Sequence, residues 1–125
     1  MISFNEVLQL HNKSIKDFGG SYGIRDTNLL ESAIARPYQS FGEIEFYPTP
    51  FEKAAALIES IVKNHPFIDG NKRTGFLACY VLLYQNKIRL TADQELAYQF
   101  VIDIASSNIQ FEDIVIWLRQ HTQSL

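Results

Sequence analysis

A ten-residue segment near the middle of the chain, residues 65–74, concentrates the residue types that phosphate chemistry uses. His65 carries an imidazole, which titrates near neutral pH and can accept a proton from an attacking hydroxyl group. Asp69 carries a carboxylate, and Mg²⁺ is commonly bound by one or two carboxylates together with phosphate oxygens. The pair predicts phosphoryl or nucleotidyl transfer, a reaction in which positioning and electrostatic stabilisation supply most of the catalysis.

The residues that follow Asp69 predict a helix start that binds phosphate. Asn71, Lys72 and Arg73 would form a first helical turn, whose free N–H groups and positive dipole end attract anions. Cations oppose that dipole, so a purely structural helix would favour Asp or Glu there. Gly70 permits a positive φ or a close approach of the backbone to phosphate. We therefore expect these four residues to contact phosphate oxygens.

Each of these residues also has a structural interpretation when it is taken alone. A histidine at a helix C-terminus often caps the helix dipole, and Asp-Gly-Asn is a common turn sequence. Taken together, the carboxylate and the two first-turn cations have no such explanation. Elsewhere, Arg25 and Asp26 could shape the rim of the site, but Asp26 is favoured as a helix cap.

The spacing of apolar residues predicts six helices around this segment. The first begins with a capping box of Ser3 and Glu6 and ends at Gly19. The helix over residues 71–86 is apolar around its circumference and is therefore expected in the middle of a bundle. The other predicted helices are a short one around residues 29–34, one over residues 51–64, one capped by Thr91 and Gln94, and one near residues 111–121. Residues 39–50 predict a small hairpin, and residues 88–90 a brief extended link. We expect one all-α domain over residues 1–125.

Composition and charge exclude several classes of protein. The chain has 125 residues, 46% of them hydrophobic and 20% charged, as in globular domains. The net charge of −3 argues against a broad nucleic-acid surface, so no direct nucleic-acid partner is expected.

The single cysteine, Cys79, cannot form an intrachain disulfide and is predicted to be an inert core residue. His121 lies near the end of the last predicted helix, and no zinc-ligand spacing is present. With no long apolar run and no signal peptide, we expect a cytoplasmic protein without membrane contact.

Residues 65–73, HPFIDGNKR, closely resemble the signature loop of the Fic/Doc superfamily. Lys72 stands where adenylylating Fic enzymes usually have Gly, which resembles the Doc (death-on-curing) branch. The resemblance extends to residues 18–21, 23–26, 29–33 and 48–55. It implies a Fic/Doc-type helical bundle with the loop between two central helices, and transfer from ATP, with Mg²⁺, to a hydroxyl of a protein target.

The same resemblance implies a role for each residue of the loop. His65 would be the catalytic base, and Asp69 would hold Mg²⁺. Gly70, Asn71, Lys72 and Arg73 would bind the phosphates. The hairpin would match the family's flap, in which Phe41, Ile44 and Phe46 would align a target segment beside the loop by strand addition.

Two departures from the adenylylating members predict the reaction. Those members usually carry a second arginine where this chain has Phe76, and Lys72 fills space that they leave open. Both changes favour transfer of the γ-phosphoryl group, as in the Doc branch, whose target is elongation factor Tu and whose activity arrests translation. A cognate antitoxin from a neighbouring gene is the implied partner. Adenylylation (AMPylation) and an inactive binding module remain the alternatives.

Overall fold

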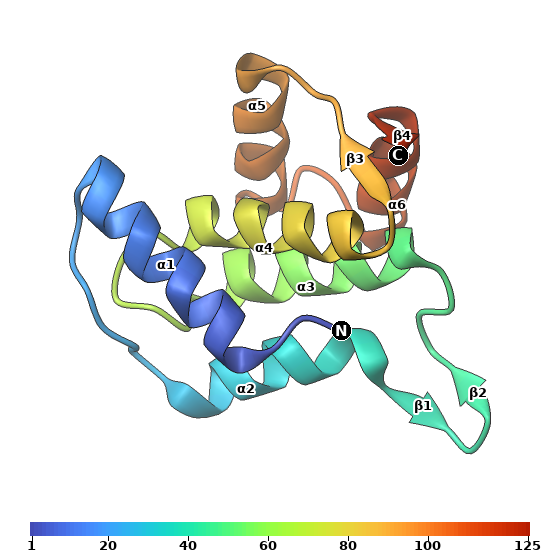
Figure 1. Cartoon of the computed structure of the whole chain (residues 1–125), viewed down its shortest axis with the longest axis horizontal. Coiled ribbons are helices and arrows are strands. Elements are labelled where there is room, and N and C mark those ends of the chain that lie inside the picture. The colour runs from blue at the N-terminus through green and yellow to red at the C-terminus, as the bar shows by residue number, and fades with distance from the viewer.

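Two antiparallel helices, α3 (Pro50–Asn64) and α4 (Asn71–Gln85), form the centre of the computed structural model, which describes residues 1–125 (Figure 1). The helix α1 (Phe4–Phe18) packs on α4, and α2 (Thr27–Ala35) packs on α3. The last two helices, α5 (Gln94–Ala105) and α6 (Phe111–Gln120), both contact α3 on its other side. The predicted all-α architecture of about six helices is confirmed.

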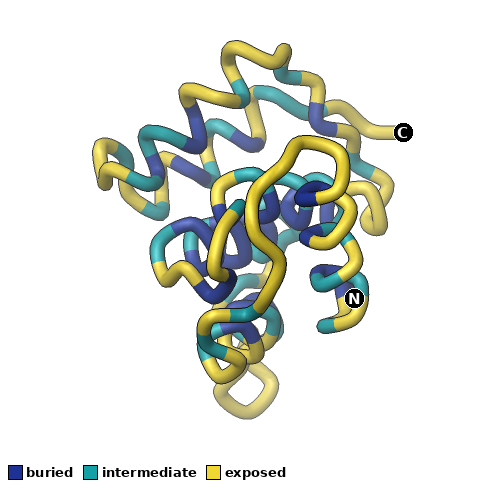
Figure 2. The backbone as a smooth tube through the Cα atoms, turned by 90° about the vertical axis from the view of Figure 1, so that its left-hand side faces the viewer, coloured by how far each residue is buried: buried dark blue, intermediate teal, exposed yellow.

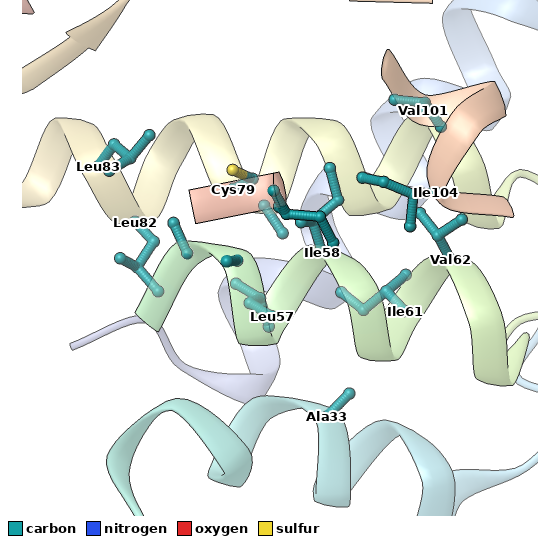
Figure 3. Close-up of a cluster of buried hydrophobic side chains, with 14 of the residues drawn as sticks. Ala33, Leu57, Ile58, Ile61, Val62, Cys79, Leu82, Leu83, Val101 and Ile104 are labelled. Carbon is teal, nitrogen blue, oxygen red and sulfur yellow. The ribbon is translucent and has the colours of Figure 1, made fainter. Parts of the chain in front are cut away.

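The core lies between α3 and α4 because both helices present small or branched apolar side chains to each other (Figure 3). Ile58 and Ile61 of α3 are fully buried, and both have side-chain atoms within 4 Å of the position that a Cβ on Gly75 of α4 would take. Gly75 lets the two backbones approach closely: a Cβ at this position would lie 2.8 Å from Cγ2 of Val62. The close packing fixes the two helix ends that flank residues 65–70.

The prediction that α4 is enclosed on all sides is only partly right. Ala78, Cys79 and Leu82 are fully buried, and burial raises the pKa of the Cys79 thiol far above its ordinary value. The opposite side of the helix is half-buried, and Tyr84 is 49% exposed. Tyr80 stacks on Tyr84 there, with ring centroids 6.2 Å apart, so the aromatic residues partly cover each other.

Capping hydrogen bonds explain most helix boundaries, and at one helix they differ from the predicted start. The capping box of Ser3 and Glu6 is present, and Oδ1 of Asp26 accepts from the Leu29 N–H at 3.1 Å, as predicted. The start predicted for the fifth helix is wrong: the N-cap of α5 is Asp93, whose carboxylate accepts from the Leu96 N–H. Thr91 instead donates its N–H to the His121 carbonyl.

Two small antiparallel hairpins complete the fold. The predicted hairpin is present as β1 (Ser40–Phe41) and β2 (Ile44–Glu45), and the 3₁₀-helix η1 (Arg36–Tyr38) leads into it. A second pair was not predicted: the segment expected as a link is β3 (Ile88–Leu90), which pairs with β4 (Thr122–Ser124) at the C-terminus. The strand β4 consists of polar residues, so it carries no hydrophobic pattern that could have revealed it.

Arg36 attaches the first hairpin to α3. Its guanidinium donates to the Tyr47 hydroxyl at 3.0 Å, to Glu59 Oε1 at 2.9 Å and to Ser60 Oγ at 3.0 Å. Partial burial disfavours the charge, but the hydrogen bonds and charge interactions with Tyr47 and Glu59 outweigh it, so the pKa of Arg36 lies above its ordinary value. No helix in the fold is both long and apolar enough to cross a bilayer.

Replacing Leu57 by Ala should lower the free energy of unfolding by about 2–5 kcal/mol, because it leaves a cavity at a fully buried position between α3 and its neighbours. Leu96→Ala is the matched control: this side chain is 46% exposed, so its truncation should cost less than about 1 kcal/mol. Urea denaturation of the two variants measures the difference, and equal losses would contradict the assigned core.

Candidate phosphate-binding site

The chain leaves α3 through His65, which adopts the left-handed conformation at φ 52° and ψ 58°. A residue with a side chain is strained in this region, so neighbouring contacts must hold it there. Arg25 supplies them: its Nε donates to the His65 carbonyl at 2.6 Å, and Nη2 donates to the Asn64 carbonyl at 2.7 Å. His65 is exposed to solvent, and its imidazole forms no hydrogen bond within the protein.

The next residues attach the loop to the segment between α1 and α2. The Pro66 carbonyl accepts from the backbone N–H groups of Arg25 and Asp26, at 2.8 and 3.0 Å. Phe67 is fully buried, and its backbone forms an isolated β-bridge with Ile24. The loop is therefore part of the packed structure, although it is only a short connection.

Asn71 closes the loop on itself. Its Oδ1 accepts from the Phe67 N–H, and its Nδ2 donates to the Phe67 carbonyl, both at 2.9 Å and both buried. The amide group therefore has a structural role. The group that Asn71 can offer a phosphate is its backbone N–H.

Asp69 lies beside this turn with both carboxylate oxygens engaged. Oδ2 accepts from the Ser21 N–H at 3.1 Å, and Oδ1 accepts from the Gly70 N–H at 2.8 Å. These two bonds fix the carboxylate and leave further lone pairs on both oxygens. The protein has no cluster of three or more His, Cys, Asp or Glu residues that could enclose a metal ion. A single fixed carboxylate suits Mg²⁺ that takes its other ligands from phosphate oxygens and water.

The N-terminus of α4 offers three free backbone donors. Gly70 is the N-cap at φ 75°, a conformation that favours glycine, and a Cβ there would also require Cδ1 of Ile15, 3.1 Å away, to shift slightly. The first helical N–H with a partner is that of Thr74, which donates to the Gly70 carbonyl at 3.0 Å. The N–H groups of residues 71–73 thus remain unpaired at the positive end of the helix dipole.

The two cations of this first turn differ in their surroundings. Lys72 is exposed and has no carboxylate partner. Arg73 lies against α1: its Nε donates to Ser14 Oγ, its Nη2 donates to the Gly19 carbonyl at 3.0 Å, and its Cζ lies 5.1 Å from the centre of the Phe18 ring. Neither cation is neutralised by an acidic side chain. The charge at this helix end is therefore available to an anion.

The structure brings the predicted catalytic, metal and phosphate residues together at one end of the α3–α4 pair. Figure 2 views the molecule from this end, where the nearer backbone is mostly exposed and buried helical turns lie behind it. The side chains of Phe41, Ile44 and Phe46 are exposed, but their hairpin lies at the opposite end of α3 (Figure 1). The 15 residues of α3 separate the hairpin from the loop by about 22 Å. Alignment of a target segment by this hairpin stays a prediction.

Sequence reasoning did not find the residues that hold the loop in place. Ser14, Ser21 and His11 contact it from α1 and from the α1–α2 segment, between 48 and 59 residues away in the chain. Their sequence signal is weak, since small polar residues occur on any helix or turn. From the sequence, Arg25 was expected only at the rim of the site. In the structure, its guanidinium donates to the carbonyls of Asn64 and His65 at the C-terminal end of α3.

Comparison with known proteins identifies the family of this chain. The Fic/DOC family model matches residues 1–83, so the chain belongs to the Fic/Doc family. Toxin Doc of Mycolicibacterium smegmatis is 36% identical over 99 residues, which are 78% of this chain and 76% of that protein. Protein kinase doc of Escherichia phage P1 is 29% identical over 119 residues, or 95% of this chain and 93% of that protein. Both relatives are Doc proteins, and the chain is their homologue over most of its length.

Replacing Arg25 by Met should lower the free energy of unfolding by about 1–2 kcal/mol, because the Asn64 and His65 carbonyls lose a charged donor while the apolar stem is retained. Lys13→Met is the matched control. Lys13 forms only an exposed pair with Asp17, and its loss should change stability by less than about 0.5 kcal/mol. Thermal unfolding followed by circular dichroism distinguishes the two variants. If they are equally stable, Arg25 does not hold the turn at His65.

Proposed function

We propose that this protein is a Doc-type protein kinase, which transfers the γ-phosphoryl group of ATP to a hydroxyl of a protein target. The observation that carries the proposal is the N-terminus of α4, where three unpaired N–H groups, Lys72 and Arg73 converge without an acidic neighbour in the first turn. A triphosphate has the charge and the oxygens to occupy these donors. The curated name of the phage P1 relative, a protein kinase, supports the same reaction.

Each residue of the loop has a defined part in this reaction. The imidazole of His65 accepts the proton of the target hydroxyl as its oxygen attacks the γ-phosphorus. The bond between that phosphorus and the β–γ bridging oxygen breaks, and ADP leaves. Lys72, Arg73 and the backbone N–H groups of residues 71–73 hold the phosphate oxygens and stabilise the charge that develops on them. Asp69 fits Mg²⁺ bound to the triphosphate, and that ion would neutralise phosphate charge.

The side chains at positions 72 and 76 favour γ-phosphoryl over adenylyl transfer. Lys72 is exposed at the helix start. By resemblance to the adenylylating members, its side chain would occupy space that a glycine there leaves to the nucleotide. Phe76 is half-buried and packs against the hydrophobic core, so the turn after Arg73 presents no second arginine to the phosphates. Adenylylation remains the alternative reaction. Because it transfers the α-phosphoryl group and not the γ-phosphoryl group, ATP labelled at one of these positions distinguishes the two reactions.

We further propose that the target is elongation factor Tu, that its modification arrests translation, and that an antitoxin encoded beside this protein restrains it. The name of the Mycolicibacterium smegmatis relative, a toxin, supports the toxic role and the antitoxin. The target itself rests on the resemblance of the loop to the Doc branch. In the present protein, the hairpin residues Phe41, Ile44 and Phe46 are exposed, and Lys72 and Arg73 have no acidic partner. Both regions are surfaces that a partner protein can cover.

Incubation with elongation factor Tu and ATP labelled at either the α or the γ position tests the reaction. We expect label on the target from γ-labelled ATP alone, and a loss of about 100-fold or more in His65→Ala, because the attacking hydroxyl then lacks its base. His121→Ala is the control, since this histidine caps α6 and lies outside the loop. Label that arrives only from the α position would establish adenylylation and contradict the kinase assignment.

Expression in growing bacteria tests the biological role. The wild-type protein should arrest growth, whereas His65→Ala should not, and co-expression of the neighbouring gene should restore growth by occupying the toxin. Colony counts with and without that gene measure both effects. Growth arrest that persists unchanged in His65→Ala would remove this residue from the chemistry.

A further inference from the structure

His11 is a fully buried histidine that the proposed reaction does not use. It lies on α1, and its Nε2 is 2.8 Å from the carbonyl oxygen of Asp69, which is 58 residues away in the chain. Because a carbonyl only accepts, Nε2 must carry the hydrogen of this bond. The other ring nitrogen, Nδ1, is buried without any hydrogen-bond partner.

An unpaired nitrogen in the core is unfavourable for folding, and an apolar side chain of similar volume would avoid it. Packing alone therefore does not explain a histidine at this position. The contact that distinguishes histidine from such a side chain is the hydrogen bond to Asp69. This contact points to a role in holding the loop.

The ring orientation is fixed by the loop itself. His11 stacks on Phe67, with ring centroids 3.8 Å apart and an angle of 5° between the planes. Phe67 is in turn held by its backbone bonds to Asn71. The direction of the Nε2–H donor is thus set by the same turn whose carbonyl it binds.

The hydrogen bond from His11 acts on the peptide unit that joins Asp69, the residue proposed to hold Mg²⁺, to Gly70, the N-cap of α4. The peptide between Asp69 and Gly70 is planar, so fixing its carbonyl also fixes its N–H, which donates to Asp69 Oδ1 at 2.8 Å. One end of this plane carries the Asp69 carboxylate, and the other end begins α4 at Gly70. A rotation of the plane would displace both the carboxylate and the first free N–H groups.

We infer that His11 is a positioning residue, which holds the Asp69–Gly70 peptide so that the carboxylate and the N-terminus of α4 face the same triphosphate. The inference rests on the proposed function only for the identity of the ligand, Mg²⁺ with ATP. The same face of α1 supports it, since Ser14 binds Arg73 and Ile15 packs toward Gly70.

The experiment compares variants that keep or remove the donor. His11→Met retains the volume without a donor, whereas His11→Gln places an amide N–H at nearly the reach of Nε2. Val7→Ala is the control for a general loss of packing, because Val7 is fully buried on α1 one turn before His11. If His11→Met does not fold, His11→Asn takes its place, because its shorter amide falls short of Asp69.

The first measurement is amide hydrogen exchange in the protein without nucleotide. The N–H groups of Phe67 and Ile68 should exchange at least about tenfold faster in His11→Met than in wild type, after normalisation to Ile61 in the core of α3. His11→Gln and Val7→Ala should stay within about threefold on the same scale. The second measurement is the Kd for Mg²⁺ with ATP by calorimetry, which should rise at least about tenfold in His11→Met and recover within about threefold in His11→Gln.

Exchange of Phe67 and Ile68 at the wild-type rate in His11→Met would overturn the inference, as would an unchanged Kd. A wild-type protein that does not bind Mg²⁺ with ATP would instead contradict the proposed function, and the exchange rates alone would then decide the role of His11.

Discussion

The pair of buried hydrogen bonds between the Asn71 side chain and the Phe67 backbone is the constraint on which the site depends. The chain must reverse between two packed helices within a few residues, and its interior polar groups must be paired without water. Asn71 provides both a donor and an acceptor at the required spacing. Phe67 is thereby directed into the core, and the outer side of the turn remains for the residues that meet solvent and ligand.

A second layer of contacts makes this turn part of the tertiary structure. The segment between α1 and α2 bonds Pro66, Ile68 and Asp69 through its backbone, and Arg25 secures the end of α3. Folding of the loop therefore depends on the N-terminal third of the chain, and the strained conformation of His65 is maintained by groups that are distant in sequence. The exposed imidazole is thus carried by a rigid turn.

The sequence predicted those features that depend on neighbouring residues. The six helices, the capping box at Ser3, the cap at Asp26 and the buried Cys79 follow from periodicity and local hydrogen bonding, and the structure confirms them. The pairing of β3 with β4 was missed because residues 88–90 and 122–124 meet only through tertiary structure. The contacts of Asp69 with Ser21 and His11 were missed for the same reason. The cap of α5 was placed at Thr91, since Thr91 and Asp93 are both good capping residues and only the path of β3 decides between them.

The separation of the hairpin from the loop has a consequence for the shape of any macromolecule that covers both. A polypeptide that contacts Phe41 at one end and His65 at the other must run along the outside of the central helix pair, and about seven residues of extended backbone are needed to bridge that interval. A segment with fewer extended residues than this can therefore occupy one of these regions but not both. A regulator that closes the whole side of the molecule has to be long, or it has to present a folded surface of its own.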